Sequence, residues 1–260
     1  MVQSLTYEDI LYPDCDGKPM SDNTLQYQWI VRIASNLKHL LQGQTAFVAG
    51  DLLWYPIKVL TPPAPAQAPD VLVALGRPDG YRGSYKQWEE DGVAPQVVFE
   101  ILSPSNTPKE MTAKQAFYDQ YGVLEFYVYD PISYEFWGLV RSNADQEMMP
   151  IFPLKLPWVS PLLDIRFELF DDGLAVFHPN GEIFKDPGDF INERDQIQEE
   201  RDQIQEERDQ IQEERDQIQE ERDQIQEERD QIQEERDQIQ EERDRLAAKL
   251  KAVGIDPSQL

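Results

Sequence analysis

The sequence predicts an α/β (α+β) domain, with a mixed central sheet flanked by helices, followed by a long C-terminal helix. Short strand-like runs alternate with two helical patterns over roughly the first 190 residues, which is typical of this fold class. One run, Val97–Leu102, is apolar on both faces and is expected to be a central strand. After Ile191, seven-residue repeats begin, and these favour a coiled coil.

Composition places the hydrophobic core in the first part of the chain. All five Trp precede Asn192, so we expect one globular domain over residues 1–190, a heptad-repeat coiled coil over 191–253 and a tail over 254–260. Cys15 is the only cysteine, which excludes a disulfide framework and fits a reducing compartment. Neither a signal-peptide pattern nor an apolar run of ~20 residues is present. We therefore expect a soluble, cytoplasmic protein with no membrane partner.

The globular part is itself acidic. Each of the seven ERDQIQE copies between Glu193 and Glu241 has a net charge of −2, so together they carry −14. The last nineteen residues add +1, which leaves −13 of the total of −26 on residues 1–192. A surface of this sign repels nucleic acid at long range and argues against a protein that binds phosphate non-specifically.

The first elements are expected to be a helix and two short strands. Residues Leu25–Gln42 place apolar side chains at a period close to 3.6, which predicts a helix. Thr45–Val48 and Leu52–Tyr55 are strand-like and flank a Gly50-Asp51 turn. The proline-rich connector Thr61–Pro69 follows.

Asp70 comes directly after this connector and leads the next strand, Val71–Leu75. The polar loop Gly76–Pro95, which contains Arg77, Arg82 and Lys86, is too long for a tight hairpin. A loop of that length is either functional or a solvated connection. Further strands are predicted at Val97–Leu102, Glu125–Pro131, Phe136–Val140 and Ile165–Phe170, with a hairpin over Ala175–Phe184 that turns on Asn180-Gly181.

Glu100 lies in the middle of the central strand and is expected to point inward. Val98, Glu100 and Leu102 share one face because side chains alternate along a strand. An unpaired carboxylate buried there would cost several kcal/mol, so it should meet a cation, a metal ion or hydrogen-bond donors.

The helix that follows is expected to carry a lysine on its inward face. Thr107, Pro108 and Glu110 match an N-cap, the first helical position and the third position of a capping box. Counting from that start, Lys114 shares a stripe with Phe117, Tyr118 and Tyr121, at i, i+3, i+4 and i+7. Lys114 could form a structural ion pair with Glu100, or it could belong to a site.

A third residue, Asp70, favours a site, because a carboxylate at the head of its strand can reach the same end of the sheet; on its own it would be a turn residue. Two carboxylates with a lysine suit metal-assisted phosphodiester hydrolysis. The acids hold Mg²⁺ (or Mn²⁺) through oxygen ligands, and the ammonium orients the attacking water or stabilises the developing charge.

These residues resemble the Uma-type restriction endonuclease family of the PD-(D/E)XK superfamily. The resemblance covers about Leu5 to Phe177, and is carried by the motifs PDV at Pro69–Val71, VFEILSPS at Val98–Ser105, AKQAFYDQYGV at Ala113–Val123 and FYVYDP at Phe126–Pro131. It implies a restriction-endonuclease-like fold and a metal-dependent DNA endonuclease. Asp70 and Glu100 would be the metal ligands, and Lys114 would be the catalytic lysine.

The superfamily's usual lysine position is Leu102 here, so Lys114 would act from the helix. Asp51 is either an additional acid or a turn residue.

The repeats leave a second function open. Ile recurs every seventh residue from Ile197 to Ile239, but the other seam position is Arg201 or Glu200 and their equivalents, so only half of a heptad seam is apolar. We expect homo-oligomers formed through this segment, the alternative being a fraying, partly disordered rod. The competing hypothesis for the whole chain is a catalytically silent nuclease-fold protein that acts through its coiled coil.

Overall fold

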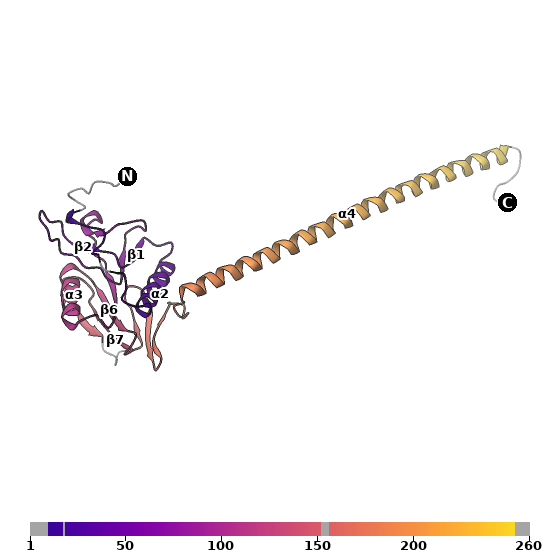
Figure 1. Ribbon diagram of the computed structural model, residues 1–260. Coiled ribbons are helices and arrows are strands. Elements are labelled where there is room, and N and C mark those ends of the chain that lie inside the picture. The colour runs from indigo at the N-terminus through magenta and orange to yellow at the C-terminus, as the bar shows by residue number, and fades with distance from the viewer. Residues whose placement is uncertain (1–9, 18, 152–155, 253–260) are drawn as a thin grey trace. The chain divides into compact units, whose positions relative to one another are not determined.

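The structure is a computed structural model that describes residues 10–17, 19–151 and 156–252. A six-stranded sheet forms the centre of its globular part, in the order β1-β3-β5-β6-β7-β8 (Figure 1). The central pair, β5 and β6, is parallel, and the other neighbours are antiparallel, so the sheet is mixed as predicted. The strands are β1 (Ala46–Gly50), β3 (Val71–Leu75), β5 (Val97–Ile101), β6 (Glu125–Asp130), β7 (Glu135–Val140) and β8 (Met149–Ile151).

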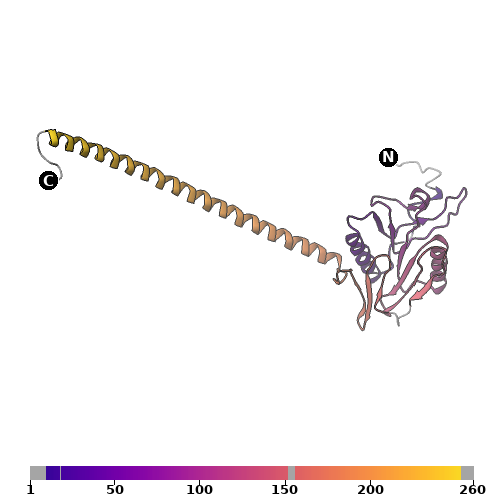
Figure 2. The same cartoon turned by 180° about the vertical axis from the view of Figure 1, so that it is seen from behind.

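Two helices cover opposite faces of this sheet, α2 (Thr24–Leu40) and α3 (Pro108–Tyr121) (Figures 1 and 2). The core under α2 contains the odd-numbered residues of β3 and β5, such as Val73 and Phe99. The core under α3 contains the even-numbered ones, such as Leu72 and Val98. The strict alternation therefore sends Glu100 toward α3, and its exposed fraction is only 2 %.

Smaller sheets flank the central one. The short strand β2 (Trp54–Tyr55) pairs in parallel with β4 (Tyr85–Lys86), and not with β1, so the two strands predicted around Gly50-Asp51 do not form a hairpin. Asp51 has a φ of 47°, and this left-handed turn directs the chain away from β1. A three-stranded sheet consists of β9 (Trp158–Val159), β10 (Arg166–Phe170) and β11 (Gly173–Phe177).

The hairpin predicted over Ala175–Phe184 is present only in part. Its turn forms, with Gly181 N donating to His178 O at 2.9 Å and a φ of 88° at Gly181. The returning arm makes one bridge, Phe177 with Ile183, and two backbone hydrogen bonds of 2.8 Å, from His178 N to Glu182 O and from Phe184 N to Val176 O, while the other edge of β11 pairs with β10 over its whole length. The sequence alone did not reveal that β10 supplies the main partner.

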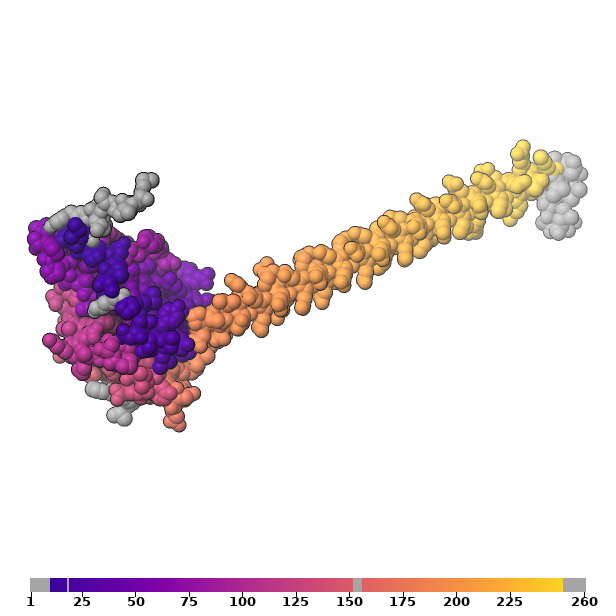
Figure 3. All heavy atoms as spheres, viewed as in Figure 1, coloured from indigo at the N-terminus to yellow at the C-terminus, as the bar shows by residue number. Residues whose placement is uncertain are grey.

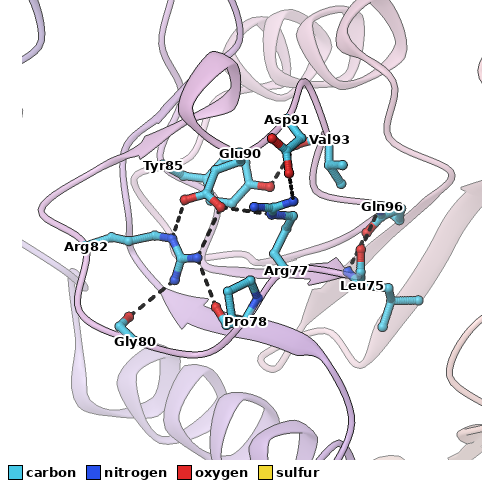
Figure 4. A network of polar contacts seen from close by, with 10 residues as sticks. All are labelled: Leu75, Arg77, Pro78, Gly80, Arg82, Tyr85, Glu90, Asp91, Val93 and Gln96. Carbon is cyan, nitrogen blue, oxygen red and sulfur yellow. Dashed lines mark hydrogen bonds and ion pairs between the residues drawn. The ribbon is translucent and has the colours of Figure 1, made fainter.

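The long loop after β3 is ordered by a compact ionic network (Figure 4). The Glu90 carboxylate lies between Arg77 Nε at 3.0 Å and Arg82 Nε at 2.5 Å, and Arg77 also pairs with Asp91. The hydrogen bonds of Arg82 lower the pKa of Glu90. The loop carries β4 and the short 3-10 helix η1 (Gln87–Glu89), so within the described chain it is a folded segment.

The C-terminal helix α4 (Pro187–Ala252) contains all the repeats. Contacts divide the chain into two compact units, Met1–Ile191 and Asn192–Leu260. Side chains stand out along the repeat segment (Figure 3), and its isoleucines are all more than half exposed. Among the described residues, no helix is long and apolar enough to cross a membrane.

Candidate active site

Three acidic residues form a row across one end of the central sheet. In the antiparallel pair β3-β5, Val71 lies opposite Phe99, so Asp70 and Glu100 are the next cross-strand neighbours. In the pair β1-β3, Gly50 lies opposite Val71, which places Asp51 beside Asp70, and Asp51 N donates to Asp70 O at 3.2 Å. Because side chains alternate along a strand, all three residues lie on the face of the sheet that α3 covers.

Asp70 is buried at the head of β3, with 7 % of its surface exposed. Its Oδ2 accepts a hydrogen bond of 2.6 Å from the backbone N–H of Ile101, which fixes the carboxylate against the end of β5. Burial raises the pKa of Asp70 well above its usual value, and the nearby Glu100 charge raises it further. No hydrogen bond to the other oxygen, Oδ1, occurs among the described residues, so this oxygen is available for a ligand.

Glu100 has a partner on each oxygen. Lys114 Nζ lies 2.7 Å from Oε2, and the Tyr118 hydroxyl donates a short hydrogen bond to Oε1. Burial raises the pKa of Glu100, while the Lys114 charge acts in the opposite direction. The cation expected beside this carboxylate is thus Lys114, and a tyrosine hydroxyl supplies a second donor that the sequence did not reveal.

Lys114 projects from α3 toward the sheet, as its stripe predicted. The helix starts at the predicted N-cap, where Glu110 N donates to Thr107 Oγ1 at 3.2 Å. Burial alone would lower the pKa of Lys114, but the charges of Glu100 and Asp70 outweigh it and raise the pKa. Lys114 is therefore an ammonium close to two carboxylates.

Tyr118 is held in place by its aromatic neighbours. It is fully buried, and its ring lies parallel to that of Trp54, with centroids 6.3 Å apart, and against Phe126 at 5.2 Å. These rings fix the direction of the hydroxyl and hence of the Glu100 carboxylate. The sequence placed Tyr118 on the correct stripe, but apolar periodicity carries no signal for the role of its oxygen.

Two members of this row, Asp51 and Asp70, line an open pocket of about 300 Å³, whereas Glu100 is not among its lining residues. Asp51, Asp70 and Lys114 line it together with residues of α2, of the segment before α2 and of the start of α3. Its other acidic lining residues are Asp16, Asp22 and Glu110. The pocket is therefore strongly acidic apart from Lys114, and it is suited to a cation or to a ligand that arrives with one.

Asp51 is a turn residue, with a positive φ, and its side chain also lines the pocket; its role as an additional acid stays a prediction. Burial raises the pKa of Asp51 to about 6, and the negative charge of Asp16 is the next largest cause of this increase. The local sequence could identify the turn, but the proximity of Asp51 to Asp70 depends on the β1-β3 register. That register is set by pairing between segments more than twenty residues apart.

Gln26 is a pocket residue that sequence reasoning missed. It lies in the first turn of α2, is buried, and donates from Nε2 to Ile101 O at 2.8 Å, next to the Asp70 contact. Its Oε1 accepts from Asp22 N at 2.8 Å. The available signal in the sequence was a polar residue on the inward-facing, otherwise apolar stripe of this helix. Such a residue indicates a specific contact, since a buried amide usually has a hydrogen-bond partner.

The donor chemistry of this site fits a hard divalent cation. Asp70 and Glu100 present adjacent carboxylates, and Asp51 lies one strand further along, whereas Mg²⁺ and Mn²⁺ prefer oxygen ligands. Within the described residues, no three or more His, Cys, Asp or Glu side chains converge closely enough to hold a metal ion by themselves. Mg²⁺ commonly binds through one or two carboxylates and keeps several waters, so two protein ligands are sufficient.

Comparisons with known proteins point to a nuclease family. The sequence model of the Uma2 family, described as "Putative restriction endonuclease", matches residues 16–176. A solved structure similar to this chain is that of a "putative nuclease belonging to DUF820" from Anabaena variabilis, with 17 % sequence identity and a TM-score of 0.39. The similarity covers 56 % of this chain and 78 % of that chain. No curated protein matches the sequence.

Proposed function

Because this chain belongs to the Uma2 family, whose description is "Putative restriction endonuclease", we propose that it is a Mg²⁺- or Mn²⁺-dependent DNA endonuclease. The observation that carries the proposal is the convergence of Asp70, Glu100 and Lys114 at one end of the sheet, beside a pocket. Hydrolysis of a phosphodiester bond is the chemistry that two carboxylates and one ammonium support best.

In this proposal Asp70 and Glu100 hold the metal ion through carboxylate oxygens. The bound ion would lower the pKa of a water molecule and neutralise charge on the phosphate. Lys114 keeps Glu100 oriented through the 2.7 Å contact and adds positive charge where negative charge develops on the substrate. The Tyr118 hydroxyl fixes the second Glu100 oxygen, so the carboxylate is positioned before any ligand arrives.

One observation favours the second candidate function, a catalytically silent nuclease-fold protein that acts through its coiled coil. All five arginines of the globular part form ion pairs with acidic residues: Arg32, Arg77, Arg82, Arg141 and Arg166. The guanidinium groups of this acidic domain are therefore already paired with carboxylates, which leaves its lysines as the remaining cationic groups for phosphate. If DNA is the substrate, its binding should depend on the metal ion and only weakly on salt.

The test is incubation of supercoiled plasmid and of linear DNA with the purified chain in Mg²⁺, Mn²⁺ or EDTA. Metal-dependent nicking that is lost in Asp70→Asn supports the endonuclease. The matched control is Lys109→Met, which changes an exposed residue on the same helix and should cut like the parent. The absence of cleavage on every DNA substrate and with either metal would favour the silent alternative.

A further inference from the structure

Among the residues that the structure describes, the isoleucine stripe of α4 is a long exposed apolar surface without a partner. Its seven isoleucines recur every seven residues, and each exposes between 52 and 67 % of its surface: Ile197, Ile204, Ile211, Ile218, Ile225, Ile232 and Ile239. A straight helix with 3.6 residues per turn drifts by about 20° per heptad relative to such a repeat. The repeat stays on one line only when helices supercoil around each other, so its regularity indicates a helical partner.

Within the described helix, the arginines beside the stripe make no ion pair, apart from Arg194 and Arg243, which each lie against the aspartate that follows. The six repeat aspartates from Asp202 to Asp237 each accept a hydrogen bond from the glutamine four residues earlier, as in Gln198 to Asp202 at 2.7 Å. The six interior arginines have no such partner, and no ion pair involves them in the described helix: Arg201, Arg208, Arg215, Arg222, Arg229 and Arg236. Each directly follows a glutamate, Glu200 in the first case, and both residues border the stripe, three and four positions after Ile197.

We propose that two copies of this chain associate in parallel along the isoleucine stripe, with Glu200 of one copy paired to Arg201 of the other and likewise in each following repeat. With Ile at heptad position d, Arg201 occupies a and contacts the glutamate at g of the partner. With Ile at a, Glu200 occupies d and contacts the arginine at e of the partner. A parallel pair therefore brings opposite charges together in either frame, although the seam residue also faces its own copy, Arg201 with Arg201 or Glu200 with Glu200.

An antiparallel pair places like charges against each other at its flanking positions. Its flanking contacts join g to g and e to e, so the frame with Ile at d opposes glutamates across the interface. The frame with Ile at a opposes arginines such as Arg201. These flanking like charges disfavour the antiparallel pair, whereas in the parallel pair two Glu–Arg contacts per repeat offset the like charges that face each other at the seam, and on this ground we assign the parallel orientation.

The parallel orientation has a consequence that rests on the proposed nuclease function. Because the globular unit precedes the repeats in each copy, two such units would be tethered at the same end of the helix pair. Two sites held together in this way suit cleavage of both strands of a duplex.

The first experiment is sedimentation equilibrium of the full chain and two charge variants. We expect the parent to be a dimer and each variant alone to dissociate at least tenfold more readily, since each opposes like charges in three heptads. An equimolar mixture of the two variants should recover the dimer. One variant carries Glu207→Arg, Glu214→Arg and Glu221→Arg, and the other carries Arg208→Glu, Arg215→Glu and Arg222→Glu.

The matched control moves the same charge change by one residue. The substitutions Glu206→Arg, Glu213→Arg and Glu220→Arg lie outside the interface in both heptad frames and should leave a dimer. A monomeric parent, a trimer or larger assembly, or a mixture that stays dissociated would overturn the proposal. None of these results depends on nuclease activity.

Orientation is tested separately by oxidation of Ile197→Cys in a Cys15→Ser background. In a parallel dimer with full overlap, which buries the most isoleucine layers, the introduced thiols face each other and should form a disulfide. If cross-linking instead requires mixing this variant with Ile239→Cys, the pair is antiparallel and the proposal is wrong.

Discussion

Two buried glutamates on adjacent strands show how differently the same side chain can be used. Glu100 on β5 and Glu125 on β6 expose 2 % and 1 % of their surfaces. Glu125 accepts hydrogen bonds from neutral donors, the hydroxyls of Tyr127 and Ser160 and the N–H of Leu162, at 2.5 to 2.8 Å. Glu100 meets the Lys114 ammonium and lies beside Asp70.

The neighbours of the two glutamates, and not their burial, distinguish a candidate site from a structural contact. Burial raises the pKa of both carboxyl groups. Glu125 binds the Ser160–Leu162 turn and so connects it to the sheet. Among the described residues, no second acid contributes to the pKa shift of Glu125. Glu100 belongs to a row of acids, two of which, Asp51 and Asp70, line an open pocket. We therefore expect metal dependence around Glu100 and none around Glu125.

The largest effect should come from removing the cation of the Glu100 site. Lys114→Met leaves the buried carboxylate without its counter-charge, and we expect it to lower the free energy of unfolding by about 3–5 kcal/mol at pH 7. Urea denaturation measures this loss. The exposed Lys109→Met on the same helix should change stability by no more than about 0.5 kcal/mol. Equal effects of the two variants would contradict the ion pair.

Glu125→Gln should have a smaller effect because no cation is left unpaired. In the parent, Glu125 Oε2 accepts hydrogen bonds from the hydroxyls of Tyr127 and Ser160. The amide of the variant keeps one acceptor oxygen, but its NH₂ group cannot accept either bond. We expect a loss of about 1–3 kcal/mol in the same denaturation experiment. Metal binding should be unchanged. A weaker metal-induced stabilisation in this variant would contradict the expected difference between the two glutamates.

Metal affinity should rise with pH, because carboxyl groups must lose their protons to bind the ion. The pKa of Asp51 is raised to about 6, and that of Asp70 is raised well above its usual value. Titration calorimetry with Mn²⁺ between pH 5 and pH 7 should show an affinity that increases by up to about tenfold per pH unit for each proton released. An affinity independent of pH would place the ion elsewhere.

Asp51→Asn should have the smallest effect, and with the opposite sign. The folded-state pKa of about 6 exceeds the usual value of 3.8, so the folded protein binds more protons than the unfolded one between these values and loses stability as pH rises through them. Asn also tolerates the left-handed turn at this position. We expect a gain of less than about 1 kcal/mol at pH 7, which disappears below pH 4. Melting temperatures at both pH values provide the measurement.

The parts of the site that could be predicted are those that periodicity and local signals determine. Strand alternation indicated that Glu100 points inward, and the Thr107 cap fixed which face of the helix carries Lys114. These two residues meet because β5 and α3 are consecutive in the chain. The mixed sheet and the helices on its two faces followed from the same alternation of patterns.

The remaining parts depend on pairings between distant segments. Asp51 joins the row only through the β1-β3 register, and Gln26 reaches Ile101 only because α2 packs against β5. The Glu90 network likewise forms between residues thirteen positions apart within one loop. No local motif specifies these contacts, because each results from the packing of elements that a single sequence does not order.

The most direct test of the central claim is the effect of metal on thermal unfolding. Parent, Glu100→Gln, Asp70→Asn and Glu125→Gln should be melted in EDTA and in saturating Mg²⁺ or Mn²⁺. An ion that binds the native site raises the melting temperature by mass action. We predict a metal-dependent increase in the parent and in Glu125→Gln, and none in Glu100→Gln or Asp70→Asn. The contradicting result is a parent whose melting temperature is the same in EDTA and in either metal, together with a strongly destabilised Glu100→Gln. That result would show that Glu100 and Lys114 form only a structural ion pair.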